Sequence, residues 1–180
     1  MSPIEELKME IHSNVFRVEP STIVDLGKLP TIVESYCKSK KQYKKLLEEH
    51  VEQLSLLQRL HYAAKRYALL LIFLHMSRDE QRKRFIERID DPDKNWKFSL
   101  TDIHERHFWN DYMKAYEDCL GATSAQHAPW YVVPADDKEN ARVIVSQIVL
   151  DGLGRLEVAY PKVSKERVKQ LKSIREDLSK

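Results

Sequence analysis

The chain has 180 residues, of which 42% are hydrophobic and 32% are charged, the composition of a globular protein with a charge-rich surface. Its formal net charge of +2 is almost balanced, so composition does not support a nucleic-acid-binding protein, and any anion site must be local. The two cysteines are too few for a disulfide framework and indicate a reducing, cytoplasmic setting.

The sequence contains no segment that is expected to direct the chain to a membrane. Residues 1–10 include acids and lack the apolar core of a signal peptide. The longest apolar run, residues 67–74, is far shorter than the roughly 20 residues that a membrane-spanning helix needs. We therefore expect no membrane partner.

The length suits one domain with a sizeable core, and no internal repeat divides the sequence. We expect a single domain over residues 1–180. In chain order, its expected segments are an irregular arm (1–38), a long helix (39–66), a strand (67–76), a basic segment (77–100), a helix-strand-helix unit (101–160) and a C-terminal helix (161–180).

The long helix is predicted by a capping signal and a regular apolar pattern. Ser39 and Gln42 have the spacing of a capping box, in which each residue satisfies a backbone donor of the other. Apolar residues then recur at steps of three and four, which predicts an amphipathic helix over residues 40–66. Its narrow apolar stripe would suit a partner chain, but packing on its own domain is the simpler interpretation.

Two segments are predicted to be strands. Residues 67–75 form a continuous apolar run, which is typical of a parallel-sheet strand buried on both faces, and residues 130–134 form a second, shorter strand. Helices flank both segments, so we expect an α/β fold that is mostly helical. A sheet of only two strands is marginally stable by itself.

The helices between the two strands are predicted from their ends. Ser77 and Glu80 form a second capping-box pair, so a helix is expected to begin near residue 78. It ends near residue 89, because the residue before Pro92 avoids helical dihedral angles. A further helix over residues 101–120 is expected to end with Gly121 in the left-handed conformation.

Two more helices are predicted after the second strand. The acidic turn Asp136-Asp137 either caps a helix or holds a metal ion, and capping is the simpler interpretation. The capped helix is expected to reach residue 159, with Gly152 and Gly154 as weak points. A final charged helix over residues 165–178 is expected to be exposed to solvent.

The segment after the first predicted strand is dense in cations. Arginine matches phosphate oxygens with a forked pair of donors and lysine adds mobile charge, so such a row suits a polyanion. Acids such as Asp79, Glu80 and Glu87 are interleaved with the cations, and the residues alone favour an ordinary salt-bridged surface. The cations are Arg78, Arg82, Lys83, Arg84, Arg88, Lys94 and Lys97.

Aromatic and histidine residues follow the basic segment. Trp109, Tyr112 and Tyr116 lie at helical spacing, for which core packing is the simpler interpretation and a stacking platform for a base is the alternative. His104 and His107 are three residues apart, but no third ligand is suitably spaced. We therefore predict no metal-binding residues.

A phosphate-binding loop is missing from the sequence. Such a loop has the pattern Gly-x-x-x-x-Gly-Lys after a strand, so that backbone donors wrap a phosphate at a helix N-terminus. The only Gly-Lys pair is Gly27-Lys28, where Thr22 stands in place of the first glycine and Leu29 in place of the following Ser or Thr. No predicted strand precedes it.

Several motifs carry a resemblance to a known family. The most specific are Arg88-Ile89 with Asp91-Pro92, Lys94 and Trp96-Lys97; Tyr116-Glu117-Asp118; and Ala128-Pro129-Trp130-Tyr131-Val132-Val133-Pro134-Ala135-Asp136. Over most of its length the chain resembles the polyphosphate kinase 2 family. The resemblance implies a P-loop kinase-like parallel sheet and phosphoryl transfer between inorganic polyphosphate and nucleotides with Mg²⁺.

The chain also departs from the family pattern. The family's first strand runs into the Gly-rich loop and a second acidic motif follows, but here that strand joins a later-strand sequence near residues 72–74. Both motifs are therefore missing, as after an internal deletion, and the fold is expected to be a remnant of the family sheet. Glu139 stands where the family usually carries Trp. We predict no catalytic residues and no tightly bound Mg²⁺.

The resemblance assigns the basic segment to a lid that grips a phosphate chain. By family chemistry the protein is a polyphosphate kinase 2-like phosphotransferase, expected to be inactive without the Gly-rich loop. The alternative is a non-catalytic polyanion-binding protein, or an oligomerisation partner of an intact paralogue. A homo-oligomer also fits, and the expected ligands are polyphosphate and nucleotide. The implied polyphosphate- or nucleotide-binding residues are Arg84, Arg88, Lys94, Lys97 and Arg106.

Overall fold

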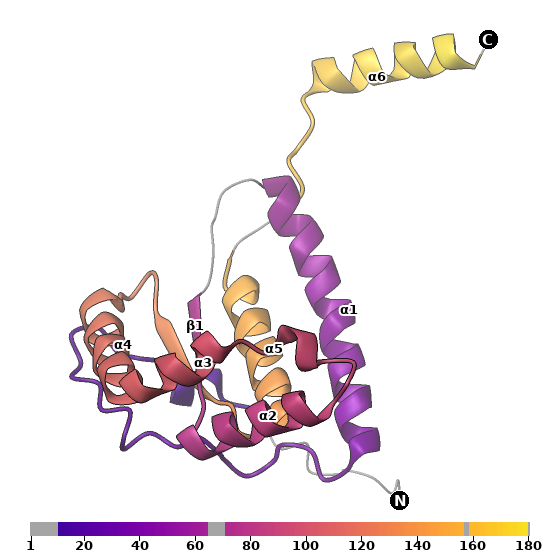
Figure 1. The fold of residues 1–180 in the computed structure, drawn as a ribbon. Helices are drawn as coiled ribbons and strands as arrows, with labels where there is room; N and C mark the ends of the chain where they lie inside the picture. Colours follow the sequence, from indigo (N-terminus) through magenta and orange to yellow (C-terminus); the bar gives the residue numbers. More distant parts are fainter. Residues whose placement is uncertain (1–10, 65–70, 157–158, 180) are drawn as a thin grey trace, which may run out of the picture.

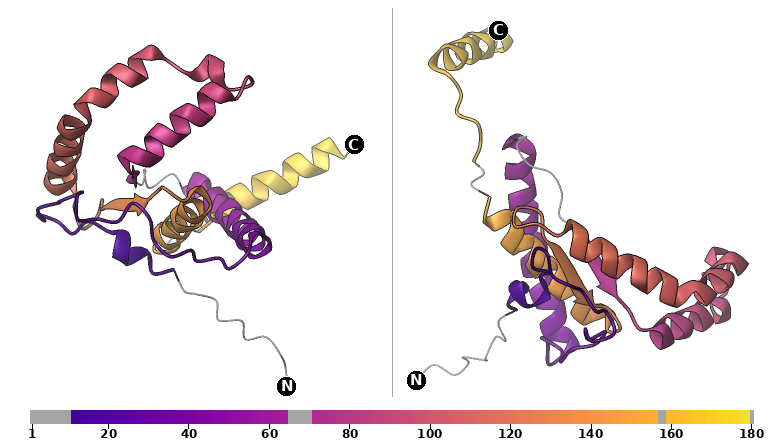
Figure 2. Two further views of the ribbon diagram at one scale, coloured as in Figure 1. Left: turned by 60° about the horizontal axis from the view of Figure 1, so that its bottom comes forward. Right: turned by 90° about the vertical axis from the view of Figure 1, so that its left-hand side faces the viewer.

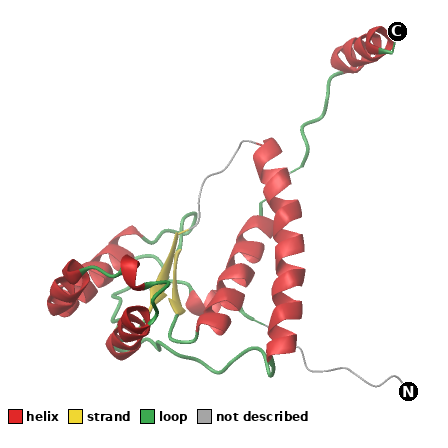
Figure 3. Cartoon of the chain, turned by 45° about the vertical axis from the view of Figure 1, so that its right-hand side comes forward, coloured by secondary structure: helices red, strands yellow, loops and turns green. Residues whose placement is uncertain are grey.

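The computed structural model describes residues 11–64, 71–156 and 159–179. Within these ranges, helices lie on both sides of a small parallel sheet (Figures 1 and 3). In chain order the elements are η1 (Ser13–Phe16), α1 (Lys40–Ala64), β1 (Leu71–His75), α2 (Arg78–Asp90), η2 (Asn95–Lys97), α3 (Leu100–Glu105), η3 (Arg106–Phe108), α4 (Trp109–Thr123), β2 (Trp130–Pro134), α5 (Lys138–Gly154) and α6 (Lys165–Leu178).

The sheet consists of β1 and β2, which pair in parallel with Leu71 opposite Trp130 and His75 opposite Pro134. This arrangement confirms the predicted α/β fold with two parallel strands in a mostly helical chain. Strand β2 is buried on both faces, as expected from its apolar sequence. Strand β1 is less covered, since the Leu74 side chain is 53% exposed. The predicted strand residues 67–70 lie outside the described ranges.

One face of the sheet packs against α5 and α1, which lie side by side (Figure 1). On α5, Val143, Ile144 and Ile148 are fully buried among residues of β2 and α1. A polar contact joins the helices as well, because His50 Nδ1 lies 2.6 Å from Ser146 Oγ. Helix α1 therefore uses part of its apolar stripe to pack on its own chain.

The other face of the sheet packs against α4 and the N-terminal segment. Val132 of β2 and Leu120 of α4 are buried together with Val18 and Leu26. The Val18 N–H donates to the Trp130 carbonyl at 2.9 Å, so the N-terminal segment runs along the free edge of β2. The segment predicted as an irregular arm thus has little regular structure but supplies buried core residues.

Capping signals located the helix starts correctly. Ser77 Oγ accepts the Glu80 N–H at 3.1 Å at the start of α2, and Ser39 Oγ accepts the Gln42 N–H at 3.2 Å before α1. Asp137 caps α5. The helix predicted for residues 101–120 differs, because η3 interrupts it between α3 and α4.

The prediction that Gly121 ends its helix was wrong. Helix α4 continues to Thr123, and none of the described glycines has a positive φ. A close approach explains the glycine instead, since a Cβ atom at Gly121 would lie 2.8 Å from the Thr22 carbonyl oxygen. The missing side chain lets the N-terminal segment cross α4 at contact distance.

Replacing Gly121 by alanine should therefore destabilise the protein. The added methyl group meets backbone rather than a flexible side chain, so we expect a loss of about 1–3 kcal/mol in the free energy of unfolding. Urea or thermal denaturation measures it. Gly152→Ala is the matched control, because no atom lies within 4 Å of its Cβ position in α5. There, alanine should be neutral or stabilise by up to about 1 kcal/mol.

The chain after α5 leaves the body of the molecule. Helix α5 ends at Gly154, earlier than the predicted residue 159. Helix α6 then stands apart from the other elements, and all of its residues are exposed, as predicted (Figure 1). Among the described residues, no helix is long and apolar enough to cross a membrane.

Candidate functional site

The carboxyl ends of the two strands meet at one edge of the sheet. Helix α2 begins three residues after β1, and Asp136 follows β2 directly after Ala135. The basic segment therefore starts over the carboxyl ends of the strands, where open α/β sheets bind their ligands. In this arrangement, a cation-rich segment is positioned to bind an anionic ligand at the edge of the sheet.

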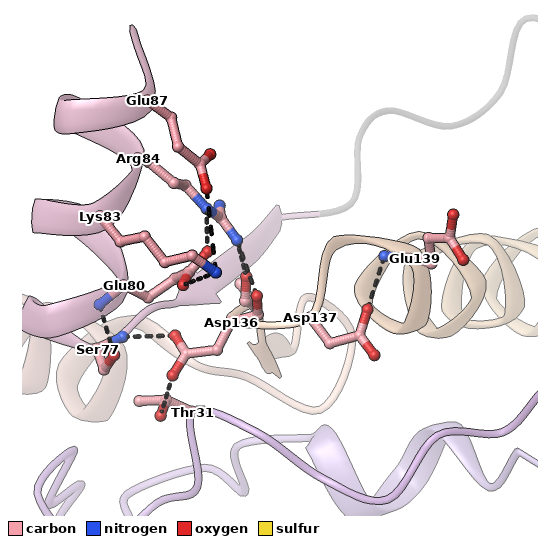
Figure 4. A network of polar contacts seen from close by, with 10 residues as sticks. Thr31, Ser77, Glu80, Lys83, Arg84, Glu87, Asp136, Asp137 and Glu139 are labelled. Atoms are coloured by element: carbon pink, nitrogen blue, oxygen red, sulfur yellow. Dashed lines mark hydrogen bonds and ion pairs between the residues drawn. The ribbon is translucent and has the colours of Figure 1, made fainter. Parts of the chain in front are cut away.

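Asp136 ties three segments together at this edge (Figure 4). One carboxylate oxygen accepts the Ser77 N–H at 2.8 Å, and the other accepts the Thr31 hydroxyl at 2.8 Å. The neighbouring Asp137 accepts the N–H groups of Glu139 and Asn140 at 2.9 and 3.1 Å. Both carboxylates thus accept hydrogen bonds that hold neighbouring segments in place. Asp137 caps the N-terminus of α5, as the simpler interpretation of the acidic turn predicted.

Arg84 fastens α2 to the end of β2. Its Nε donates to Glu80 at 2.7 Å, and its Nη2 donates to the Ala135 and Asp136 carbonyls at 2.7 and 3.1 Å (Figure 4). The side chain is only 17% exposed. These contacts use most of its donors, so Arg84 has a structural role in addition to the ligand-binding role that the sequence predicts.

Arg106 brings η3 against the start of α2. Its Nη1 donates to the Arg78 carbonyl and to Gln81 Oε1, both at 2.8 Å. Burial lowers the pKa of the Arg106 guanidinium, and the positive charges of Arg78 and Arg82 lower it further, whereas Asp79 opposes this. The guanidinium groups of Arg78 and Arg82 are thus each close enough to repel that of Arg106.

Arg78, Arg82 and Arg106 form what we call the arginine cluster. Within the part of the chain that the structure describes, no ion pair joins any of the three to a carboxylate. Lys83, by contrast, lies 3.7 Å from Glu80 and 4.0 Å from Glu87. Grouped like charges that outnumber their counter-charges are costly unless an anion binds between them, so the cluster is the strongest candidate anion site.

The other predicted residues lie at the far end of α2. Figure 2 shows α2, α3 and α4 forming an arch beside the sheet, with the turn around η2 away from the strands. The Arg88 Cζ atom lies 5.8 Å from the centre of the Phe85 ring, and the Lys97 Nζ atom lies 5.0 Å from the centre of the Trp96 ring. Lys94 forms an ion pair with Asp91. The hydrogen bond with Asp91 raises the pKa of Lys94.

The five predicted binding residues are therefore divided into two groups. Arg84 and Arg106 lie near the carboxyl ends of the strands, and Arg88, Lys94 and Lys97 lie around the turn. Only Arg106 belongs to the arginine cluster. A ligand that reached both groups would have to extend along α2, which suits a chain of phosphates better than a compact anion.

Comparison with known proteins identifies the family. The sequence model described as "Polyphosphate kinase 2 (PPK2)" matches residues 29–161. The chain belongs to the polyphosphate kinase 2 family. An ADP-polyphosphate phosphotransferase of Rhodopseudomonas palustris is 52% identical over 120 residues, which are 67% of this chain and 42% of that protein. An AMP/ADP-polyphosphate phosphotransferase of Meiothermus ruber is 44% identical over 93 residues, 52% of this chain and 35% of that protein.

A solved structure of polyphosphate kinase 2 from Arthrobacter aurescens TC1 has a similar fold. It aligns with a TM-score of 0.54 and 34% sequence identity, covering 78% of this chain and 48% of that one. This family member thus spans less than half the length of these relatives. The likeness confirms the P-loop kinase-like fold that the sequence motifs imply.

Sequence reasoning overlooked part of the arginine cluster of this polyphosphate kinase 2 family member. Arg78 and Arg82 were counted among the cations of the basic segment but not among the binding residues. Their spacing of four residues on one helix face was the available signal. What no sequence pattern supplied was the position of Arg106, which η3 brings back against the first turn of α2.

Proposed function

We propose that this polyphosphate kinase 2 family member binds inorganic polyphosphate through the arginine cluster and does not transfer phosphoryl groups itself. The observation that carries the proposal is the grouping of Arg78, Arg82 and Arg106 beside the carboxyl ends of the strands, where the described residues form no ion pair with them. Phosphate oxygens accept the forked donors of arginine, and a polymer can continue along α2 toward Arg88, Lys94 and Lys97.

The proposed loss of activity rests on the missing loop. Phosphoryl transfer depends on backbone donors, a lysine and a metal ion that stabilise the charge of the transferred group. The only Gly-Lys pair of the sequence lies in a turn, where Lys28 forms an ion pair with Asp25 at 2.8 Å. That lysine stabilises its own turn rather than a phosphate cradle.

We further propose that Mg²⁺ is not held tightly. Among the described residues, no group of three or more His, Cys, Asp or Glu side chains is placed to hold a metal ion. Both carboxylate oxygens of Asp136 already accept hydrogen bonds. The donors at the strand ends therefore do not fit a resident Mg²⁺, and polyphosphate binding should survive in EDTA. We also propose a cytoplasmic location, because a polyphosphate-binding protein would encounter its ligand there.

Removing two members of the arginine cluster should weaken polyphosphate binding. We expect the Arg78→Ala plus Arg82→Ala variant to bind at least tenfold more weakly at low salt, because each lost charged hydrogen bond is worth about 1.5–3 kcal/mol. Titration calorimetry or fluorescence anisotropy at several salt concentrations measures it. Binding should also fall steeply as salt increases.

The matched control removes equal charge from a site away from the cluster. Lys169→Ala plus Lys172→Ala in α6 should leave polyphosphate affinity within about twofold of the original protein. If the original chain failed to bind polyphosphate at low salt, or if both double variants lost the same affinity, the arginine cluster would not be the site.

A second role, association with another chain, is favoured by exposed apolar residues on α1. Val51, Leu56 and Tyr62 are 54%, 52% and 78% exposed. An intact family member or a second copy is the proposed partner. Light scattering after size-exclusion chromatography tests self-association, and co-elution with a full-length paralogue tests the hetero-oligomer. Monomers in both experiments would exclude this role.

A further inference from the structure

Helix α6 carries an apolar stripe that is open to solvent in the single chain. Val168, Leu171 and Ile174 recur at steps of three and are 42%, 46% and 47% exposed, and Leu178 is 84% exposed. We call these four residues the α6 stripe. A helix of 14 residues is only marginally stable in water by itself, so packing this stripe on another surface would stabilise it.

Helix α1 carries a second stripe beside the face that packs on α5. Leu47, Val51 and Leu54 follow one another at steps of four and three, so they share one side of the helix. Leu47 also touches the core, whereas Val51 is 54% exposed. Tyr62, which is 78% exposed, continues this side about three turns beyond Val51. We call these four residues the α1 stripe.

Charged residues on the two stripes are complementary. On α6, Arg167 and Arg175 lie one turn before and one turn after Leu171. On α1, Glu48 and Glu52 are exposed beside the stripe. Among the described residues, no ion pair joins any of these arginines or glutamates to an opposite charge. Contact between the two stripes would therefore bring unpaired cations toward unpaired acids.

The ends of the two helices favour an antiparallel arrangement. Helix α6 ends with Glu176 and Asp177, and α1 begins with a lysine-rich segment, residues 40–45. An antiparallel pair brings the acidic end of α6 to these lysines. A parallel pair would instead place Lys165 against them, and like charges in contact oppose association.

A second copy of the chain is the partner that the structure favours. Figures 1 and 2 show α6 extending away from the body of its own chain, and all of its residues are exposed. Both stripes are therefore available in one chain. Two copies that exchange their α6 helices would form the same contact twice around a two-fold axis. The repetition doubles the buried area, which matters because one short helix covers less than a standard interface.

We propose that two copies of this chain exchange α6, so that the α6 stripe of each copy packs antiparallel on the α1 stripe of the other. This inference rests on the proposed association through α1, for which it names the partner surface. Neither stripe contains a residue of the arginine cluster, so polyphosphate binding should not depend on the exchange. Helix α6 thus acts as an arm for assembly.

Two charge-reversal variants of the full chain test the exchange. The first carries Glu48→Arg plus Glu52→Arg in α1, and the second carries Arg167→Glu plus Arg175→Glu in α6. Each variant alone places like charges together in both contacts, so its dimer dissociation constant should rise at least about tenfold. The substituted side chains are exposed, so the fold should persist, which circular dichroism checks.

An equimolar mixture of the two variants should restore the dimer. The reversed arm of one copy meets the reversed stripe of the other, and the two original surfaces also meet, so both contacts regain opposite charges. We expect a dissociation constant within about threefold of that of the original protein, measured by sedimentation equilibrium over a range of concentrations. Docking of α6 on its own chain would give no such restoration, because each variant keeps its own mismatch.

Lys169→Ala plus Lys172→Ala is the matched control, since these lysines lie outside the α6 stripe and their loss should change the dissociation constant by less than about twofold. Self-association that both reversed variants retain, or that their mixture fails to restore, would overturn the exchange and leave the proposed association of chains intact. An original protein that stays monomeric at every concentration would overturn both the exchange and self-association, but not polyphosphate binding. Slow hydrogen exchange of α6 in that monomer would mean that α6 closes on its own α1.

Discussion

Incubated with polyphosphate, Mg²⁺ and ADP or AMP, this chain is expected to form product at least about 10³-fold more slowly than the Rhodopseudomonas palustris phosphotransferase. The physical reason is that the sequence lacks the Gly-x-x-x-x-Gly-Lys pattern, whose backbone amides cradle the transferred phosphate. Binding a donor polymer and an acceptor lowers no barrier unless the transferred group meets aligned donors in its transition state. The proposed arginine cluster would attract phosphate through side-chain guanidinium groups instead.

The measurement is a coupled assay of nucleotide formation, run beside the R. palustris enzyme at equal concentration. The same preparation should bind polyphosphate, which shows that it is folded and competent for its ligand. Turnover within tenfold of the enzyme would contradict the proposal and would require a phosphate cradle built from other residues.

Arg84→Ala is expected to cost stability more than ligand affinity. The substitution removes three hydrogen bonds and takes the Arg84 donors away from Glu80 Oε1 and two carbonyl oxygens at a mostly covered site. We expect a loss of about 2–4 kcal/mol in the free energy of unfolding. For a chain of this size, that loss lowers the melting temperature by about 5–12 °C.

Arg88→Ala is the matched control for Arg84→Ala. Arg88 lies one turn further along α2, and its guanidinium lies over the Phe85 ring, so its removal should change the melting temperature by less than about 2 °C. Polyphosphate titration well below the melting temperature completes the comparison. A stable Arg84→Ala protein with at least tenfold weaker binding would assign Arg84 to the ligand site and remove its structural role.

The sequence predicted the elements that local rules determine. Caps at Ser77 and Asp137 set helix starts because a side-chain oxygen there satisfies a free backbone donor. The apolar runs gave the strands because a parallel sheet between helices buries both faces. These features depend on residues that are neighbours in the chain, so one sequence is enough to identify them.

Features that depend on distant segments were missed. Glycine is the residue type that most often follows a helix end, which suggested that role for Gly121. Its actual role is set by the approach of Thr22 from the N-terminal segment. The break between α3 and α4 likewise accompanies the contacts of Arg106 with α2. Neither arrangement has a periodic signature. Nδ1 of His75, which is buried without a hydrogen-bond partner among the described residues, belongs to the same class, since only the folded chain shows which polar atoms remain without partners.

The free side of β1 affects how the isolated protein must be handled. Within the described ranges its backbone pairs only with β2, and its sequence Leu-Ile-Phe-Leu-His contains neither the charge nor the proline that discourages strand addition. Unpaired peptide groups beside the half-exposed Leu74 form a template for another extended chain. We therefore expect concentrated samples to aggregate through this edge, and dilute, low-temperature conditions to favour the native protein.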